Sequence, residues 1–177
     1  MSNKGSGWER QVCKFLSKWV QGSEKPYIYW RGHGSGAMFT NNELTGDIFA
    51  GDIYCLRDDG RFLTDRFVIE CKNGYKDISL DNHLKNLKSD QLKQFWFKVY
   101  SEGNKVNKYA MLIYKKKGFK NPWIFICNDI YKKVNKYISE LQYIHLKYDE
   151  RESYVFNFYE FFECITPDMI KKIKKRR

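Results

Sequence analysis

The sequence predicts a single mixed α/β domain with a central sheet, and three observations carry this prediction. Apolar residues recur at helical spacing in two segments, residues 8–20 and 92–100. Short apolar runs bounded by turn-forming residues lie between and after these segments, as expected for strands. The chain has 177 residues, of which 42% are hydrophobic, which suffices for one core. The expected order is α, β, β, β, α, β, β, followed by a C-terminal extension.

The first predicted helix begins near residue 8 and ends at Gln21-Gly22-Ser23. Its apolar stripe consists of Trp8, Val12, Phe15, Leu16, Trp19 and Val20. A short strand is expected at residues 27–31, after Pro26. Residues 32–46 contain four glycines and are expected to form a loop.

Two further strands are predicted at residues 52–56 and 67–72. Asp58-Asp59-Gly60 between them is a turn signal, so we expect the two strands to pair as an antiparallel hairpin. The second amphipathic helix follows, with an apolar face that consists of Leu92, Phe95, Trp96, Val99 and Tyr100. Strands at residues 109–114 and 123–127 complete the predicted core.

Residues 128–177 are predicted to form an extension that packs on the core formed by residues 1–127. One short helix and two strands are expected in this extension, at residues 130–137, 143–148 and 154–159. Thr166-Pro167-Asp168 has the N-cap, the proline and the first-turn acid of a helix start. The chain ends in KKIKKRR, which we expect to be a basic tail.

The charge balance predicts a polyanionic partner. Lys plus Arg total 32 against 21 Asp plus Glu, which gives a formal net charge of +11. A surplus of this size favours nucleic acid as the partner, although a generally basic, Lys-rich proteome would produce the same balance.

Cysteine spacing and the N-terminus indicate a reduced, cytoplasmic protein. The five cysteines lie far apart without a CxxC pair, so no zinc-ribbon signature is present and reduced, buried thiols are expected. The first residues lack the apolar core of a signal peptide. No run of about 18 apolar residues predicts a transmembrane helix. We therefore expect a cytoplasmic location, which includes a host cytoplasm for a phage-encoded protein, and no contact with a membrane.

A chemical site is predicted around the strand FVIECK, residues 67–72. Residues i and i+2 of a strand share a face, so Glu70 and Lys72 point the same way. In a regular antiparallel hairpin Asp52 can oppose Glu70, which brings two carboxylates and one ammonium together. Two hard oxygen donors suit Mg²⁺, and Lys72 can orient an attacking water or help deprotonate it. The pattern predicts a phosphodiester hydrolysis site, and a Glu–Lys ion pair at a strand edge is the alternative.

Asp47 is the rival acid, because TGDIFAGDI contains two Gly-Asp-Ile units. In a regular ladder residue 47 has the wrong parity to oppose Glu70, and it precedes the Ala50-Gly51 break. A bulge would remove this parity argument. Asp52 is therefore the preferred ligand, and Asp47 stays open.

These motifs resemble a known nuclease family. Gly51-Asp52, the connecting segment and Glu70-Cys71-Lys72 look like the PD-(D/E)xK signature, with glycine in place of proline. KGSGWERQVCKFLSKW resembles the opening helix of archaeal-type Holliday junction resolvases and related phage nucleases. Arg31 followed by Gly34-Ser35-Gly36-Ala37 resembles the Arg…SGA segment of the same proteins.

The resemblance is specific over residues 4–75, topological to about residue 127, and absent over 128–177. It implies a restriction-endonuclease-like core, α-β-β-β-α-β, with a central mixed sheet, for which residues 1–127 form the nuclease core. His33 inside the Arg…SGA segment and the extra C-terminal third depart from the family pattern. The detailed role of that segment and the choice of substrate therefore stay open.

The resemblance also implies the site residues. The acids of the metal site would be Glu9, Asp52 and Glu70, and these would act in catalysis together with Lys72. The positions associated with the substrate phosphate or with active-site order are Lys4, Arg10, Arg31 and Ser35. From the residues alone, Glu9 is equally well explained as a first-turn glutamate stabilised by the helix dipole. The implied cofactor is Mg²⁺, for which Mn²⁺ can substitute.

The implied function is that of a metal-dependent DNA endonuclease, and the best match is a Holliday junction resolvase that acts on branched DNA in recombination and repair. Two symmetric cuts need two active sites, which implies a homodimer. One alternative is a PD-(D/E)xK endonuclease for other DNA structures or for specific duplex sites. The other is a non-cleaving DNA-binding protein of the same fold, against which the intact set of Asp52, Glu70 and Lys72 argues.

Overall fold

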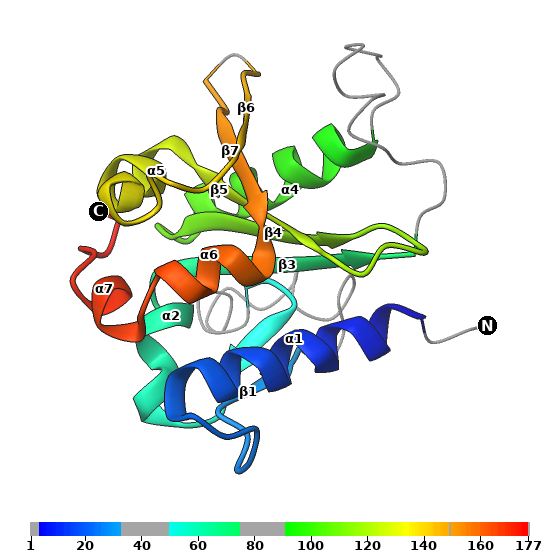
Figure 1. The fold of residues 1–177 in the computed structure, drawn as a ribbon, viewed down its shortest axis with the longest axis vertical. Helices are drawn as coiled ribbons and strands as arrows, with labels where there is room; N and C mark the ends of the chain where they lie inside the picture. Colours follow the sequence, from blue (N-terminus) through cyan, green and yellow to red (C-terminus); the bar gives the residue numbers. More distant parts are fainter. Residues whose placement is uncertain (1–3, 33–49, 75–90, 149, 177) are drawn as a thin grey trace.

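A computed structural model describes residues 4–32, 50–74, 91–148 and 150–176, with side chains from residue 7 onward (Figure 1). The elements in chain order are α1 (Lys4–Gln21), β1 (Tyr29–Arg31), β2 (Ile53–Cys55), η1 (Asp58–Gly60), α2 (Arg61–Thr64), β3 (Phe67–Asn73), α4 (Gln91–Lys105), β4 (Tyr109–Lys115), β5 (Trp123–Cys127), α5 (Asn128–Val134), η2 (Asn135–Tyr137), β6 (Ile144–Leu146), β7 (Ser153–Asn157), α6 (Phe158–Cys164) and α7 (Pro167–Lys171). The predicted fold class is confirmed: a mixed α/β domain with a central sheet flanked by helices, as in a restriction-endonuclease-like fold.

The central sheet has five strands in the order β3-β4-β5-β7-β6. β3 and β4 are parallel and are connected through α4, whereas the remaining pairs are antiparallel. β4 reads YAMLIYK and is buried along six of its seven residues, because α4 packs on it while β3 and β5 flank it. α1 packs against both β1 and β3, and α4 contacts β3 as well as β4. Strand β3 therefore lies within reach of two helices.

The predicted hairpin between residues 52–56 and 67–72 is wrong. β2 pairs with β1 in a separate two-stranded antiparallel sheet, with Arg31 opposite Ile53. The connection that was expected to be a turn folds instead as η1 and α2. Gly60 lies beneath β1, where the Tyr29 hydroxyl donates to its carbonyl over 2.9 Å, and Leu63 is fully buried. These tertiary contacts favour a short helical connection over a tight turn.

Residues 128–176 supply part of the central sheet. β7 pairs with β5, and β6 pairs with β7 at the edge of the sheet. The strand expected at 154–159 ends at Asn157, because the Asn157 side chain accepts the backbone N–H of Tyr159 over 3.0 Å and starts α6. The predicted helix start at Thr166 is confirmed, since its hydroxyl accepts from the Met169 N–H and Pro167 occupies the first turn.

The basic C-terminal residues lie against the start of β3 and β4. The Arg66 guanidinium donates to the carbonyls of Ile173 (2.5 Å) and Lys171 (2.9 Å), and the Tyr109 hydroxyl donates to the Lys174 carbonyl. Ile173 is buried, so this segment is fixed by an apolar contact as well. Arg66 precedes Lys72 by six residues, which places these contacts about 20 Å from Lys72 along an extended strand.

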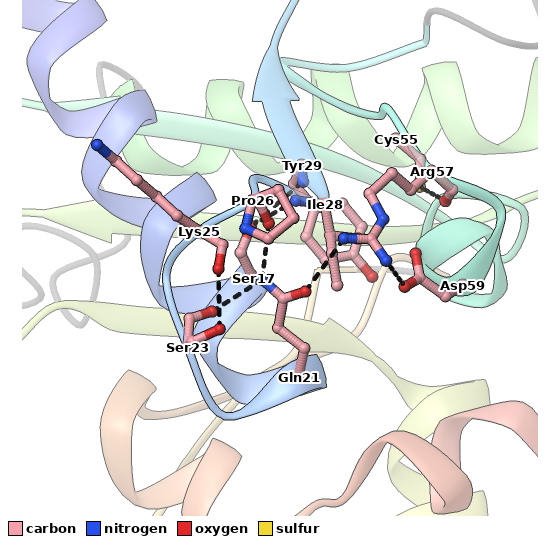
Figure 2. A network of polar contacts seen from close by, with 10 residues as sticks. All are labelled: Ser17, Gln21, Ser23, Lys25, Pro26, Ile28, Tyr29, Cys55, Arg57 and Asp59. Atoms are coloured by element: carbon pink, nitrogen blue, oxygen red, sulfur yellow. Dashed lines mark hydrogen bonds and ion pairs between the residues drawn. The ribbon is translucent and has the colours of Figure 1, made fainter.

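A network of polar contacts joins the end of α1 to β1 (Figure 2). The buried Ser17 hydroxyl accepts the backbone N–H groups of Ile28 (3.1 Å) and Tyr29 (3.3 Å). The Gln21 side chain donates to the Pro26 carbonyl over 2.7 Å and accepts from Arg57 over 3.4 Å. The network fixes the start of β1 against α1, and β1 then leads to Arg31.

The five cysteines are free thiols, and three of them, Cys13, Cys71 and Cys127, are buried. In the part of the chain that the structure describes, no helix has the length and apolar character needed to cross a membrane.

Candidate active site

Asp52, Glu70 and Lys72 converge beside β3. The Lys72 ammonium contacts Glu70 Oε1 directly and lies 3.7 Å from Asp52 Oδ2. Asp52 is only 4% exposed and Glu70 only 2%, so both carboxylates are almost fully withdrawn from water. The structure thus brings together the three side chains that the sequence predicted to share one site, although not through the predicted hairpin.

Asp52 reaches β3 through a close parallel approach of the chain at Gly51. Gly51 forms an isolated parallel bridge with Ile69, and the Asp52 N–H donates to the Ile69 carbonyl over 2.7 Å. The Cys71 N–H then donates to Asp52 Oδ2 over 2.8 Å, which fixes the carboxylate toward β3. Asp52 is therefore positioned by backbone hydrogen bonds to β3, just before β2 begins.

Glycine is required at residue 51 for two separate reasons. Its φ is +90°, a conformation that L side chains rarely adopt. A Cβ at this position would also lie 2.7 Å from the Ile69 carbonyl oxygen and 2.9 Å from the Ile69 nitrogen. A proline, which the signature usually carries here, has φ fixed near −65° and does not fit this backbone.

The parity argument that favoured Asp52 over Asp47 assumed an antiparallel ladder, which β2 and β3 do not form. Asp52 nevertheless lies at the site through the Gly51 bridge. Asp47 lies outside the described residues, so the structure does not compare the two acids.

Burial and mutual repulsion dominate the electrostatics of the site. Burial, together with the nearby Glu70 carboxylate, raises the pKa of Asp52 to about 7, although Lys72 and the Cys71 N–H oppose the increase. Burial also raises the pKa of Glu9, against the attraction of Arg31 and Lys72. A cation placed between two such acids would stabilise their ionised, negatively charged forms.

Glu9 and Arg31 lie next to this group rather than within it. Glu9 Oε2 on α1 is 3.9 Å from Arg31 Nη1 at the end of β1. The neighbouring Gly32 N–H donates to the Asp52 carbonyl over 2.8 Å, so the end of β1 is tied to Asp52. Arg10 is exposed on α1. The Lys4 side chain and Ser35 lie outside the described part of the structure.

The carboxylates offer hard oxygen donors, which fit a divalent cation such as Mg²⁺. Asp52 and Glu70 both contact the same atom, Lys72 Nζ, so their carboxylates lie close together. Among the described residues, no three His, Cys, Asp or Glu side chains form a group ready to hold a metal ion. Glu9 is electrostatically coupled to Glu70 and Asp52 but is not joined to them in one ligand group.

Sequence reasoning missed one residue of the site, Lys98. It lies on α4, and its ammonium is 3.3 Å from Glu70 Oε1 and 3.6 Å from Glu102 Oε1. Burial lowers the pKa of Lys98, but the attraction of Glu70 and Glu102 outweighs this and the net pKa is raised. The spacing of Lys98 and Glu102, i and i+4 beside the apolar stripe of α4, was the available signal.

A fold of this type, with an Asp, a Glu and a Lys brought together beside its edge strand, is typical of the PD-(D/E)xK class of nucleases. The model of the family described as "Phage putative PDDEXK endonuclease" matches residues 1–175. The chain belongs to this family, and so is a phage-type nuclease that acts on DNA. Nucleases of the PD-(D/E)xK type generally use divalent metal ions. No curated protein and no solved structure matches the chain significantly.

Gly51→Ala is expected to lower the free energy of unfolding by about 2–4 kcal/mol, because strain at positive φ adds to crowding against Ile69. Gly74→Ala is the matched control, since Gly74 has φ +91° and nothing within 4 Å of its added Cβ. It should cost only the strain of a non-glycine residue at positive φ, about 1 kcal/mol. Urea unfolding of both variants measures the difference. Equal losses in the two variants would contradict the close approach described here.

Asp52 is expected to make the metal-free protein less stable as pH rises. Its pKa of about 7 in the folded state exceeds the ordinary aspartate pKa of 3.8 that it regains on unfolding. The folded state therefore binds the proton more tightly, and this contribution is complete below pH 4 and lost as pH rises through 7.

The measurement is urea unfolding of wild type and Asp52→Asn in excess chelator from pH 4 to pH 8. The stability of wild type relative to Asp52→Asn should fall steadily across this range. Asp58→Asn is the control, because the Asp58 side chain is 91% exposed. A constant difference between wild type and Asp52→Asn would show that the buried carboxylate does not titrate in this range.

Proposed function

We propose that this nuclease is a Mg²⁺-dependent DNA endonuclease whose active site consists of Asp52, Glu70 and Lys72, assisted by Glu9. The observation that carries the proposal is the convergence of two buried carboxylates on one lysine, in a chain of a PD-(D/E)xK family. Burying two acids side by side costs free energy that a purely structural role does not explain.

Asp52 and Glu70 would hold the metal ion, with Glu9 as a further acid from α1. Bound there, a divalent ion polarises the phosphodiester and stabilises the charge that develops on it. The backbone fixes Asp52 through two hydrogen bonds, at 2.7 Å and 2.8 Å, so this ligand is preorganised before a cation arrives. Mn²⁺ also takes oxygen ligands and is expected to replace Mg²⁺.

Lys72 is the residue suited to act on the attacking water. It lies on the same face of β3 as Glu70, and its side chain is 19% exposed, so it borders both the acids and solvent. As an ammonium it would orient the water and favour its deprotonation, so that the water loses a proton to solvent as its oxygen attacks phosphorus. The P–O bond to the leaving strand would then break, and the leaving oxygen would take up a proton from solvent.

The basic residues beside the site would contact the DNA backbone. Arg31 lies next to Glu9, and Arg10 is exposed one residue further along α1. Lys4 and Ser35 are proposed for the same role from the family pattern. The net charge of +11 supports general attraction to DNA without specifying its shape.

We assign a four-way junction as the preferred substrate and a homodimer as the active form. The support is the combination of the KG…ER helix, the Arg31 segment and the Asp52, Glu70 and Lys72 set, which together resemble Holliday junction resolvases. A C2 dimer would hold two sites at a fixed spacing, which suits two strands at a crossover.

Asp52→Asn and Glu70→Gln are each expected to reduce DNA cleavage by orders of magnitude while the protein stays folded, because each removes a metal ligand. The assay is single-turnover cleavage of labelled DNA in Mg²⁺, in Mn²⁺ and in excess chelator. Asp58→Asn and Glu163→Gln are the controls, since both side chains are exposed. Full activity of both site variants, or of wild type in chelator, would exclude the metal mechanism.

A preference for four-way junctions is expected over linear duplex of equal length. The measurement is competition binding at about 0.15 M salt, where non-specific binding is weak, in Ca²⁺ or chelator to prevent cleavage. Light scattering at micromolar concentration should give the mass of a dimer. A monomer, or equal affinity for both DNA shapes, would remove the resolvase assignment and leave an endonuclease for other DNA structures or duplex sites.

A further inference from the structure

Two lysines from different elements share one buried carboxylate oxygen. Glu70 Oε1 is contacted by Lys72 from its own strand and by Lys98 from α4 over 3.3 Å. Lys98 is not part of the signature that the sequence shows, and the cleavage mechanism described above does not use it. Its position next to a proposed metal ligand therefore needs an explanation of its own.

Structural stabilisation does not account for the Lys98 contact. The Lys98 side chain is 53% exposed, and ion pairs of such exposed lysines add little to stability. Glu70 already has Lys72 as a direct partner. Lys72 is shared with Asp52, so Lys98 makes two ammonium groups for two carboxylates, and the cleavage assay below separates charge compensation from substrate binding.

The two ammonium groups differ in how firmly they are held. Lys72 lies between Asp52 and Glu70, near the Phe95 ring, and is only 19% exposed. Lys98 is more exposed and has a second acid, Glu102, one helical turn further along α4 at 3.6 Å. If Glu70 binds a dication, an ammonium at the same oxygen must withdraw, and Lys98 is the one with another acid and open solvent beside it.

The surroundings indicate what a mobile cation at this place would bind. Glu9, Asp52, Glu70 and Glu102 interact electrostatically around the site. Such a concentration of acids repels the phosphates of an approaching DNA strand. A lysine at the exposed rim offsets that repulsion, and its flexible stem lets the ammonium follow a phosphate oxygen.

We propose that Lys98 is a DNA-phosphate-binding residue of this active site, which Glu70 and Glu102 hold beside the scissile position until metal and DNA arrive. The inference rests on the proposed function. It adds a second cationic side chain to the site: Lys72 acts on the attacking water, and Lys98 binds the DNA. Lys98 would bind the scissile phosphate or its immediate neighbour. Glu102 is then a positioning residue, which receives Lys98 when Glu70 binds the cation.

Lys98→Met is expected to change metal binding and cleavage in opposite directions. Mn²⁺ alone, measured by calorimetry without DNA, should bind several-fold more tightly, because a competing ammonium is removed from Glu70. Single-turnover cleavage at saturating Mg²⁺ should fall by about 100- to 1,000-fold, as for the loss of one positioned donor to the reacting group. Lys98→Arg should retain most of the cleavage rate.

Lys105→Met is the matched control, because it removes the same charge from the same helix about 10 Å further along its axis. It should leave Mn²⁺ binding unchanged and cleavage within a few-fold of wild type. Glu102→Gln should weaken Mn²⁺ binding, because Lys98 then stays at Glu70, and adding Lys98→Met should abolish this effect.

Each other result overturns the inference. Tighter Mn²⁺ binding with an unchanged cleavage rate in Lys98→Met would mean that Lys98 only neutralises Glu70. Weaker Mn²⁺ binding together with slower cleavage would mean that Lys98 only supports the site structurally. If wild type itself neither binds Mn²⁺ nor cleaves DNA, the proposed function fails, which is a distinct outcome from failure of the role of Lys98.

Discussion

The close approach of Gly51 to Ile69 is the contact on which the site depends. It lets the chain run beside β3 without a side chain in between, so that the Asp52 N–H reaches the Ile69 carbonyl and the Asp52 carboxylate reaches the Cys71 N–H. A residue with a Cβ would push the two backbones apart. One glycine thus places an acid next to Glu70 from a segment that does not pair with β3 as a strand. The polar network at the end of α1 complements this contact, since it fixes β1, whose end is tied to Asp52 through Gly32.

The charges of the candidate site fit the proposed chemistry better than they fit a purely stabilising role. Burial and the neighbouring Glu70 carboxylate raise the pKa of Asp52. The lysines that compensate the charges of these two acids come from β3 and α4. Replacing such a group by packed apolar residues often costs a protein nothing. Buried charges that do not favour folding are expected where function, and not stability, selects the residues.

The last quarter of the chain is built into the sheet rather than attached to it as a flexible tail. β7 pairs with β5, and the backbone of residues 171–174 is held by Arg66 and Tyr109 at the start of β3 and β4. The family match extends to residue 175, which agrees with this arrangement. Basic residues of this segment therefore lie at the end of β3 that is far from Lys72.

The sequence by itself determined the elements whose signals are local. Helical spacing identified α1 and α4, apolar runs identified β4 and β5, and the period of two residues placed Glu70 and Lys72 on one face. The tertiary structure alone decided that the segment after β2 is helical, because Gly60 packs beneath Tyr29, and that Asp52 meets β3 in parallel. It also decided that Lys98 reaches Glu70, because α4 packs on β3. Such contacts join residues far apart in the chain, and periodicity carries no information about which surfaces meet.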